Sequence, residues 1–185
     1  MRKTIFCTLT LFILQSCIPL RVAPTIEDYK VTRGKRFKRS LAKREMFIFQ
    51  DPKLAGNFYD YVNIKYRLNH ENVYDDVPFL INGEQYFFSF YEVQIPDKTL
   101  NLAPLMLHLA VNAALGNEDP LEDYDADGDI YKRENWYIAI EVYNEIEKDC
   151  LADTALSREA VLKYLRVLKK EYLTTYNYHE TVFKN

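Results

Sequence analysis

The sequence predicts an α+β fold, in which an N-terminal antiparallel, aromatic-rich sheet is followed by about three helices. Three observations lead to this prediction. Between Phe47 and Tyr91 there are 13 Phe or Tyr residues, a composition that strands favour. The dipeptide Asn82-Gly83 lies between two apolar runs, as in a hairpin. After Pro96-Asp97 the apolar residues recur at helical spacing rather than alternating.

Three segments in the first part of the chain are predicted to form strands. Residues 46–49 read Met-Phe-Ile-Phe and predict a short strand, and the alternation over 59–68 predicts a second. Residues 79–81 then lead into Asn82-Gly83, and residues 85–95 lead out. Because Asn-Gly supplies the two positive φ angles of a type I′ turn, these runs predict a hairpin.

The first predicted helix covers residues 104–115, with Pro104 at its start and Gly116 after its end. This segment is apolar on nearly every side, so we expect the helix to be buried.

Two further helices are predicted nearer the C-terminus. The first spans residues 134–151, where apolar residues step by three and four along one face. These residues are Trp136, Ala139, Tyr143, Ile146 and Cys150. The second begins near Ser157, a good N-cap. Its expected buried face consists of Val161, Leu165, Leu168 and Tyr172.

The N-terminus has the pattern of a secretory signal. Arg2 and Lys3 precede an apolar run over residues 4–14, which is shorter than the about 20 residues needed to span a bilayer. The run closes on Leu14-Gln15-Ser16-Cys17, which resembles the lipobox of bacterial lipoprotein precursors. Gln15 stands where that family more often has a small or β-branched residue. An ordinary signal peptide or a short membrane anchor is the alternative.

The resemblance implies a signal peptide over residues 1–16, cleavage before Cys17 and acylation of that cysteine, for example with palmitate. No acidic residue follows Cys17 directly, since Ile18 and Pro19 come next. By the same resemblance, an acidic residue there would favour retention in the inner membrane, so its absence favours the periplasmic face of an outer membrane, where the cell has one. The expected location is therefore the cell membrane or outer membrane, with the protein facing the periplasm. The expected organisation is then a lipidated basic tether over 17–45 and a single α+β domain over 46–185.

Charge is distributed unevenly between these two parts. Residues 21–45 hold nine basic and three acidic groups, whereas residues 46–185 hold 13 basic and 24 acidic groups. The basic residues nearest the expected anchor predict contact with lipid phosphates, because each cation near an anionic surface adds about 1 kcal/mol of attraction. We single out Lys35, Arg36, Lys38 and Arg39. Docking on the acidic domain and simple solvation are the alternatives. Secretion argues against a nucleic-acid partner.

Residues 123–134 resemble the twelve-residue calcium loop of EF-hands. Carboxylates stand at loop positions 1, 3, 5 and 12, and Gly128 stands at the sharp turn at position 6. The ligand set that the resemblance implies is Asp123, Asp125, Asp127, the backbone carbonyl of Asp129, and Glu134. The resemblance therefore implies one bound Ca²⁺ with a structural role at the start of the 134–151 helix. A solvated acidic connection is the alternative.

No motif in the chain predicts catalysis. His70, His108 and His179 are far apart, and no phosphate loop or nucleophile elbow is present. Cys150 is expected to be a small buried hydrophobe. The leading hypothesis is a lipid-anchored cell-envelope protein with a structural or interaction role and one calcium loop, whose partner is an envelope protein or a glycan. The alternative is a module that binds sugar or peptide through the aromatic sheet. An envelope hydrolase comes third.

Overall fold

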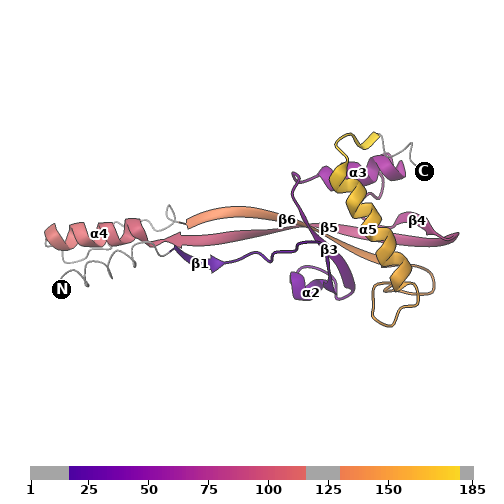
Figure 1. Cartoon of the computed structure of the whole chain (residues 1–185), viewed down its shortest axis with the longest axis horizontal. Coiled ribbons are helices and arrows are strands. Elements are labelled where there is room, and N and C mark those ends of the chain that lie inside the picture. Colours follow the sequence, from indigo (N-terminus) through magenta and orange to yellow (C-terminus); the bar gives the residue numbers. More distant parts are fainter. Residues whose placement is uncertain (1–16, 116–129, 180–185) are drawn as a thin grey trace. The chain divides into compact units, whose positions relative to one another are not determined.

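The computed structural model describes residues 17–115 and 130–179, and it has the predicted α+β architecture (Figure 1). One six-stranded sheet has the order β1-β5-β6-β3-β2, and β4 pairs with β5. The pairs β1–β5, β2–β3, β3–β6 and β4–β5 are all antiparallel. The described strands are β1 (Cys17–Arg21), β2 (Lys30–Arg33), β3 (Glu45–Asp51), β4 (Val77–Ile81), β5 (Glu84–Asn101) and β6 (Ile130–Tyr143). The described helices are α2 (Gly34–Phe37), α3 (Asn57–Tyr66), α4 (Leu102–Leu115) and α5 (Arg158–Thr174).

The chain divides into two compact units. The first consists of Met1–Pro24 and Ile95–Asn135, and the second of Thr25–Gln94 and Trp136–Asn185. Strands β5 and β6 contribute to both. The main hydrophobic core belongs to the second unit, which we call the core unit; the first we call the anchor unit.

In the core unit, helices α3 and α5 cover one face of the sheet. Alternate residues of β3, β5 and β6 point into this interface, because successive side chains of a strand lie on opposite faces. The buried strand residues are Phe47, Phe49, Tyr86, Phe88, Phe90, Ile138, Ile140 and Val142. The helices bury Phe58, Tyr61 and Val62 from α3, and Val161, Leu165, Leu168 and Tyr172 from α5. The α5 face is therefore the predicted one.

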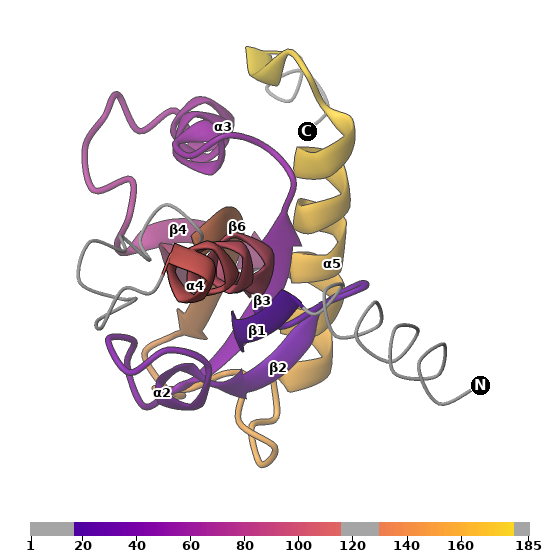
Figure 2. The same cartoon turned by 90° about the vertical axis from the view of Figure 1, so that its left-hand side faces the viewer.

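The opposite face of the sheet is covered by a smaller layer that includes α2. Figure 2 shows α2 and α5 on opposite sides of β3. Gly34 fits closely here, since a Cβ at this position would lie 2.6 Å from the Ala42 carbonyl oxygen and 2.6 Å from the Met46 sulfur. The ring of Phe37 packs edge-on against Tyr137, with 5.2 Å between the ring centroids. Both faces of the sheet are thus packed in the core unit.

The predicted hairpin is confirmed. Strands β4 and β5 pair from Val77↔Phe88 to Ile81↔Glu84. Asn82 and Gly83 connect them with φ angles of 53° and 87°, the positive values that a type I′ turn requires.

The strand predicted over residues 59–68 is wrong, because most of this segment belongs to α3 (Asn57–Tyr66). Its buried residues Phe58, Tyr61 and Val62 follow three- and four-residue spacing. Gly56 enters the helix with a φ of 84°, and its N–H donates to Glu92 Oε2 at 3.0 Å. Arg67 ends the helix in the left-handed conformation. The alternation of aromatic residues over this segment fits both periods, and packing on β3 and β5 favours the helix.

The helix predicted over residues 134–151 is also wrong, since β6 occupies residues 130–143. Ile138 and Ile140 are β-branched residues, which strands favour, and they lie opposite Phe49 and Phe47 of β3. The three- and four-residue steps over this segment are coincidental, and Ile146, a member of the series, is exposed. Cys150 is buried as predicted, but it lies in the loop after β6.

The segment predicted as a tether, 17–45, contains secondary structure. It contributes β1, β2 and α2, and β2 pairs with β3 from Lys30↔Ile48 to Arg33↔Glu45. These elements have four or five residues each, too few to show a periodicity in the sequence.

Helix α5 begins at Arg158 after Ser157, as predicted, and a carboxylate from the preceding loop secures its start. The Ser157 hydroxyl donates to Glu147 Oε2, and the Leu156 N–H donates to Glu147 Oε1 at 2.7 Å. These hydrogen bonds, with that of the Ser157 hydroxyl contributing most, lower the pKa of Glu147 below its ordinary value of 4.5. A negative charge at this end also suits the positive end of the helix dipole.

Replacing Glu147 by glutamine is therefore expected to lower the free energy of unfolding by about 1 kcal/mol at neutral pH. Because the folded-state pKa is lowered, the stabilisation is present above about pH 4.5 and is lost as the pH falls through the folded pKa. Urea unfolding of both proteins at a series of pH values measures this difference. A difference that stays constant from neutral pH down to pH values below the folded pKa would contradict the assignment.

Candidate functional site

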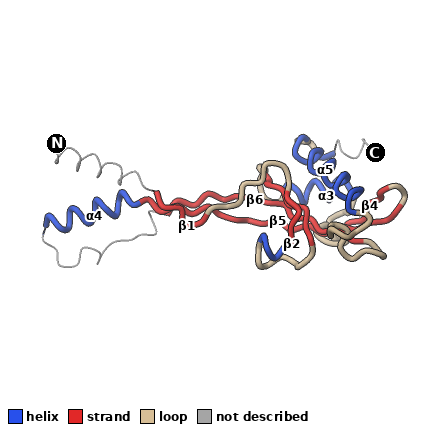
Figure 3. Tube along the Cα trace, turned by 60° about the horizontal axis from the view of Figure 1, so that its bottom comes forward, coloured by secondary structure: helices blue, strands red, loops and turns tan. Residues whose placement is uncertain are grey.

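The most informative site in the chain surrounds Cys17, the residue that the lipobox resemblance marks for acylation. In the anchor unit, β1 pairs antiparallel with the end of β5, with Cys17 opposite Asn101 and Ile18 opposite Leu100. Helix α4 starts at the next residue, Leu102. Figure 3 shows α4 continuing from the end of β5, with β1 beside that end. Residues far apart in the sequence are thus brought together where the expected lipid would be attached.

Asp97 connects the segment after β1 to β5 and β6. Its Oδ1 accepts a hydrogen bond from the Ala23 N–H at 2.5 Å, and its Oδ2 accepts one from Asn135 Nδ2 at 3.0 Å. The hydrogen bond from the Ala23 N–H lowers the pKa of Asp97 most, and the bond from Asn135 lowers it further. The charged form of Asp97 is therefore favoured. Asp97 therefore helps to hold the N-terminal strand in register with β5. From the sequence, Asp97 is recognised only as the point after which apolar residues recur at helical spacing.

Helix α4 was predicted to be buried, and that prediction is wrong. Asn101 Oδ1 accepts a hydrogen bond from the Ala103 N–H at 3.1 Å, as an N-cap does. The helix carries no charged residue, and none of its residues is buried. Leu107 and Leu115 are 67% and 71% exposed. The sequence pattern identified an apolar helix correctly, but apolarity on every side does not specify a protein interior as its environment.

Basic residues lie close to the start of this helix. Lys98 stands opposite Arg21 in the β1–β5 pairing, three residues before Asn101. Strand geometry places this pair about 10 Å from the end of β5. Neither residue was singled out from the sequence, and only the register reveals that they face one another.

The basic residues that were singled out belong to the core unit. Lys35 and Arg36 lie in α2 and are exposed, as is Arg39 just after it. Lys38 is half-buried, and its Nζ donates to the Gln94 carbonyl oxygen at 3.3 Å. Lys38 therefore has a structural contact, and contact of these residues with lipid phosphates stays a prediction.

The predicted calcium ligands Asp123, Asp125, Asp127 and Asp129 lie outside the described residues. Glu134 is described, and it lies exposed in β6. The helix that the EF-hand resemblance implies after the loop is therefore a strand. Glu134 is the only described member of the set, so the arrangement of the five predicted ligands lies outside the described residues.

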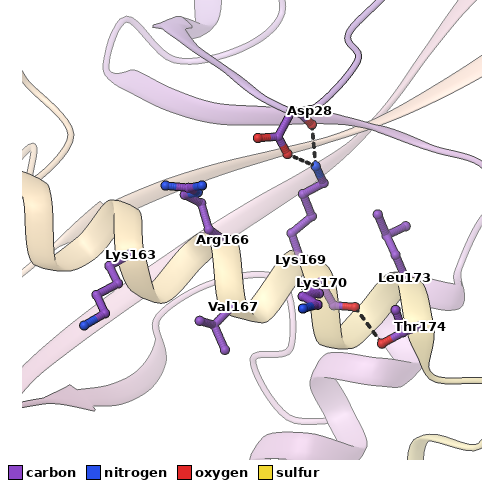
Figure 4. A pocket seen from close by; sticks show the side chains of 8 residues that line it. All are labelled: Asp28, Lys163, Arg166, Val167, Lys169, Lys170, Leu173 and Thr174. Carbon is purple, nitrogen blue, oxygen red and sulfur yellow. Dashed lines mark hydrogen bonds and ion pairs between the residues drawn. The ribbon is translucent and has the colours of Figure 1, made fainter.

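A cavity with a volume of about 470 Å³ lies along the outer face of α5. Figure 4 shows Asp28 ion-paired with Lys169 among the residues that line it. Its other charged residues are Lys163, Arg166 and Lys170. Arg166 lies over the Tyr29 ring, 5.7 Å from the centroid. The groove is open and its charges are those of a solvated helix face, so we assign it no ligand.

A second cavity of about 340 Å³ lies between the β4–β5 turn and the loop before α5. Its lining includes Glu84, Ser157 and the carboxylate of Glu147, which is engaged in hydrogen bonds at the start of α5. The nearby thiol of Cys150 is buried, and burial raises its pKa, which disfavours the reactive thiolate. These groups have structural contacts rather than the arrangement of a nucleophile and a base.

Asp51, which is buried, and Lys53, which is half-buried, lie near the end of α5. Asp51 accepts a hydrogen bond from the Tyr172 hydroxyl at 2.8 Å. Lys53 Nζ donates to the carbonyl oxygens of Tyr172 and Thr175 at 2.6 and 2.8 Å. Burial raises the pKa of Asp51 and lowers that of Lys53. These contacts bind carbonyls that a helix end leaves unpaired, so the pair has a structural explanation.

The aromatic residues expected to form a ligand-binding face are mostly buried. The ring of Phe58 lies 4.8 Å from that of Phe90 and 4.9 Å from that of Tyr172, in edge-to-face contacts typical of a core. In the described parts of the chain, the strongly exposed rings are those of Tyr74 and Tyr176. The sheet therefore uses its aromatic residues mainly for packing.

Among residues 17–115 and 130–179, no helix is both long and apolar enough to cross a membrane. Comparison of the chain with protein families, with curated proteins and with solved structures finds no match.

Proposed function

We propose that this chain is a lipid-anchored protein of the cell envelope, attached through acylated Cys17 to the cell membrane or outer membrane and facing the periplasm. The observation that supports the proposal best is the pairing of Cys17 with Asn101, directly before the apolar helix α4. A lipid on Cys17 would be attached beside a helix that also suits a lipid environment. The core unit would then serve a structural or interaction role, with an envelope protein or a glycan as partner.

Acylation of Cys17 is tested by expressing the full chain in a bacterial host supplied with radiolabelled palmitate. We expect label in the protein and recovery in the membrane fraction, and we expect Cys17→Ser to lose the label. Multiple acyl chains anchor a protein stably because each buried methylene contributes about 0.8 kcal/mol. Cys150→Ser is the matched control and should keep the label, since this thiol is buried. Label that persists in Cys17→Ser would rule the proposal out.

A structural calcium site in residues 123–134 belongs to the same proposal and is supported by the spacing of the loop carboxylates. The exit helix of an EF-hand is replaced by β6. We expect a dissociation constant of about 10⁻⁴ to 10⁻³ M, the range of extracellular calcium modules. Isothermal titration of the mature chain should show heat of binding that Asp123→Ala/Asp127→Ala abolishes. The control pair Glu118→Ala/Asp119→Ala should retain it, and an unmutated chain without calcium heat would refute the site.

Sugar or peptide binding through the aromatic sheet is the weaker candidate. Its support was the density of aromatic residues, and most of those rings lie in the core. The structural or interaction role in the cell envelope is therefore the function that we propose.

A further inference from the structure

Helix α4 presents a wide apolar face. Its 14 residues include no charge, and its exposed residues lie on one broad side of the helix and are all apolar. The opposite side, which includes Leu105 and Leu109, is half-buried. On that side Asn112 Nδ2 lies 2.8 Å from His108 Nε2. Fully burying one leucine is worth about 1.5–3 kcal/mol, so leaving the exposed face in water is unfavourable. An environment that covers this face would remove the penalty.

We infer that α4 inserts into the hydrocarbon of the same membrane leaflet that holds the acyl chains of Cys17, and so acts as a second anchor. The claim that α4 and the acyl chains share one leaflet depends on the proposed acylation of Cys17. The insertion of α4 does not depend on it. A helix satisfies its backbone hydrogen bonds internally, so α4 can enter lipid as it stands. Fourteen residues extend about 21 Å, less than the about 30 Å of hydrocarbon in a bilayer, so α4 enters the membrane without crossing it.

The surroundings of α4 favour lipid over a second copy of the chain. A helix that packs on another helix needs an apolar stripe and keeps polar residues elsewhere, whereas the exposed face of α4 takes up about half of the helix surface and carries no polar side chain. The paired residues Arg21 and Lys98 lie about 10 Å before the helix, at a depth that suits phosphate head groups. Cys17 is opposite the residue that caps the helix, so acyl chains and α4 would start at the same level.

Insertion is measured on the mature chain, residues 17–185, with Cys17→Ser so that no acyl chain contributes. The probe is a nitrobenzoxadiazole fluorophore on Leu107→Cys in a Cys150→Ala background. Vesicles contain phosphatidylethanolamine and phosphatidylglycerol, with and without brominated lipid. We expect a blue shift of the probe and quenching by bromine. The same label on Leu156→Cys, a site in the core unit that is 96% exposed, should show neither.

A charge variant tests the contribution of the helix to binding. Leu107→Glu/Val111→Glu is expected to lower vesicle binding in flotation assays at least a hundredfold, because two carboxylates would enter hydrocarbon. Ile146→Glu/Leu156→Glu adds the same charge to exposed positions of the core unit and should retain binding. Circular dichroism of both variants checks that they fold.

Two results would overturn the inference. One is a Leu107 probe that bromine does not quench, or flotation that Leu107→Glu/Val111→Glu leaves unchanged. The other is self-association of the Cys17→Ser chain without lipid, in sedimentation experiments, that shields the probe at Leu107; α4 would then pack on a second copy. Failure of acylation would appear only in the palmitate experiment, because the vesicle experiments use chains without Cys17.

Discussion

Replacing Phe58 by alanine is expected to lower the free energy of unfolding by about 3–5 kcal/mol, the largest effect of any single substitution that we predict. Phe58 is fully buried on α3, and its ring contacts Phe49, Tyr61, Phe90 and Tyr172. Truncation removes a ring where α3, α5, β3 and β5 meet, so the surrounding side chains cannot close the cavity without moving two helices. Urea unfolding, followed by the fluorescence of Trp136, the single tryptophan, measures the change.

Two further variants make this expectation falsifiable. Tyr176→Ala removes a ring of similar size from a position that is 96% exposed, and it should change the stability by less than about 0.5 kcal/mol. Phe58→Leu keeps most of the volume and should cost about 1–1.5 kcal/mol, so it remains folded if the alanine variant does not. An alanine variant as stable as Tyr176→Ala would show that Phe58 does not lie in the core.

The sequence predicted the elements whose signals are local and unambiguous. Asn82-Gly83 requires positive φ angles that few other dipeptides supply, and the buried face of α5 repeats over several turns. The segments of α3 and β6 combine aromatic and β-branched residues with spacing that fits both helix and strand. Their conformations are decided by partners distant in the chain, such as the β3 residues opposite Ile138 and Ile140.

The candidate site was predictable only in part. The pattern around Cys17 and the apolarity of α4 are both visible in the sequence. Their proximity is not, because the register of Cys17 with Asn101 depends on long-range pairing of β1 with β5. The prediction that α4 is buried took a protein interior as the environment of a helix that is apolar on nearly every side. A lipid environment is a second possibility, which periodicity cannot distinguish from a protein core.

The second largest effect is expected from the ion pair that joins α3 to α5. Lys65 Nζ lies 2.8 Å from Glu171 Oε1, and the Tyr61 hydroxyl donates to the same oxygen at 3.0 Å. The side chains of Lys65 and Glu171 are 10% and 21% exposed. Glu171→Ala should lower the free energy of unfolding by about 2–3 kcal/mol, because it leaves the Lys65 ammonium buried without its carboxylate. Asp153→Ala removes the carboxylate of an exposed pair with Arg158 and should change stability by less than about 1 kcal/mol.

The loss in Glu171→Ala measures the cost of an unpaired charge, not the net worth of the pair, and a double variant separates the two. Lys65→Met/Glu171→Leu replaces both charges by apolar side chains of similar size, so no charge is left unpaired, and the Tyr61 hydroxyl keeps the Leu168 carbonyl oxygen as an acceptor at 3.4 Å. We expect its stability to lie within about 1 kcal/mol of the unmutated chain, well above that of Glu171→Ala. If the double variant instead lost as much free energy of unfolding as Lys65→Met and Glu171→Ala lose together, the two residues would not be coupled. The contact between α3 and α5 would then depend on apolar packing around Tyr61 and Tyr172 alone.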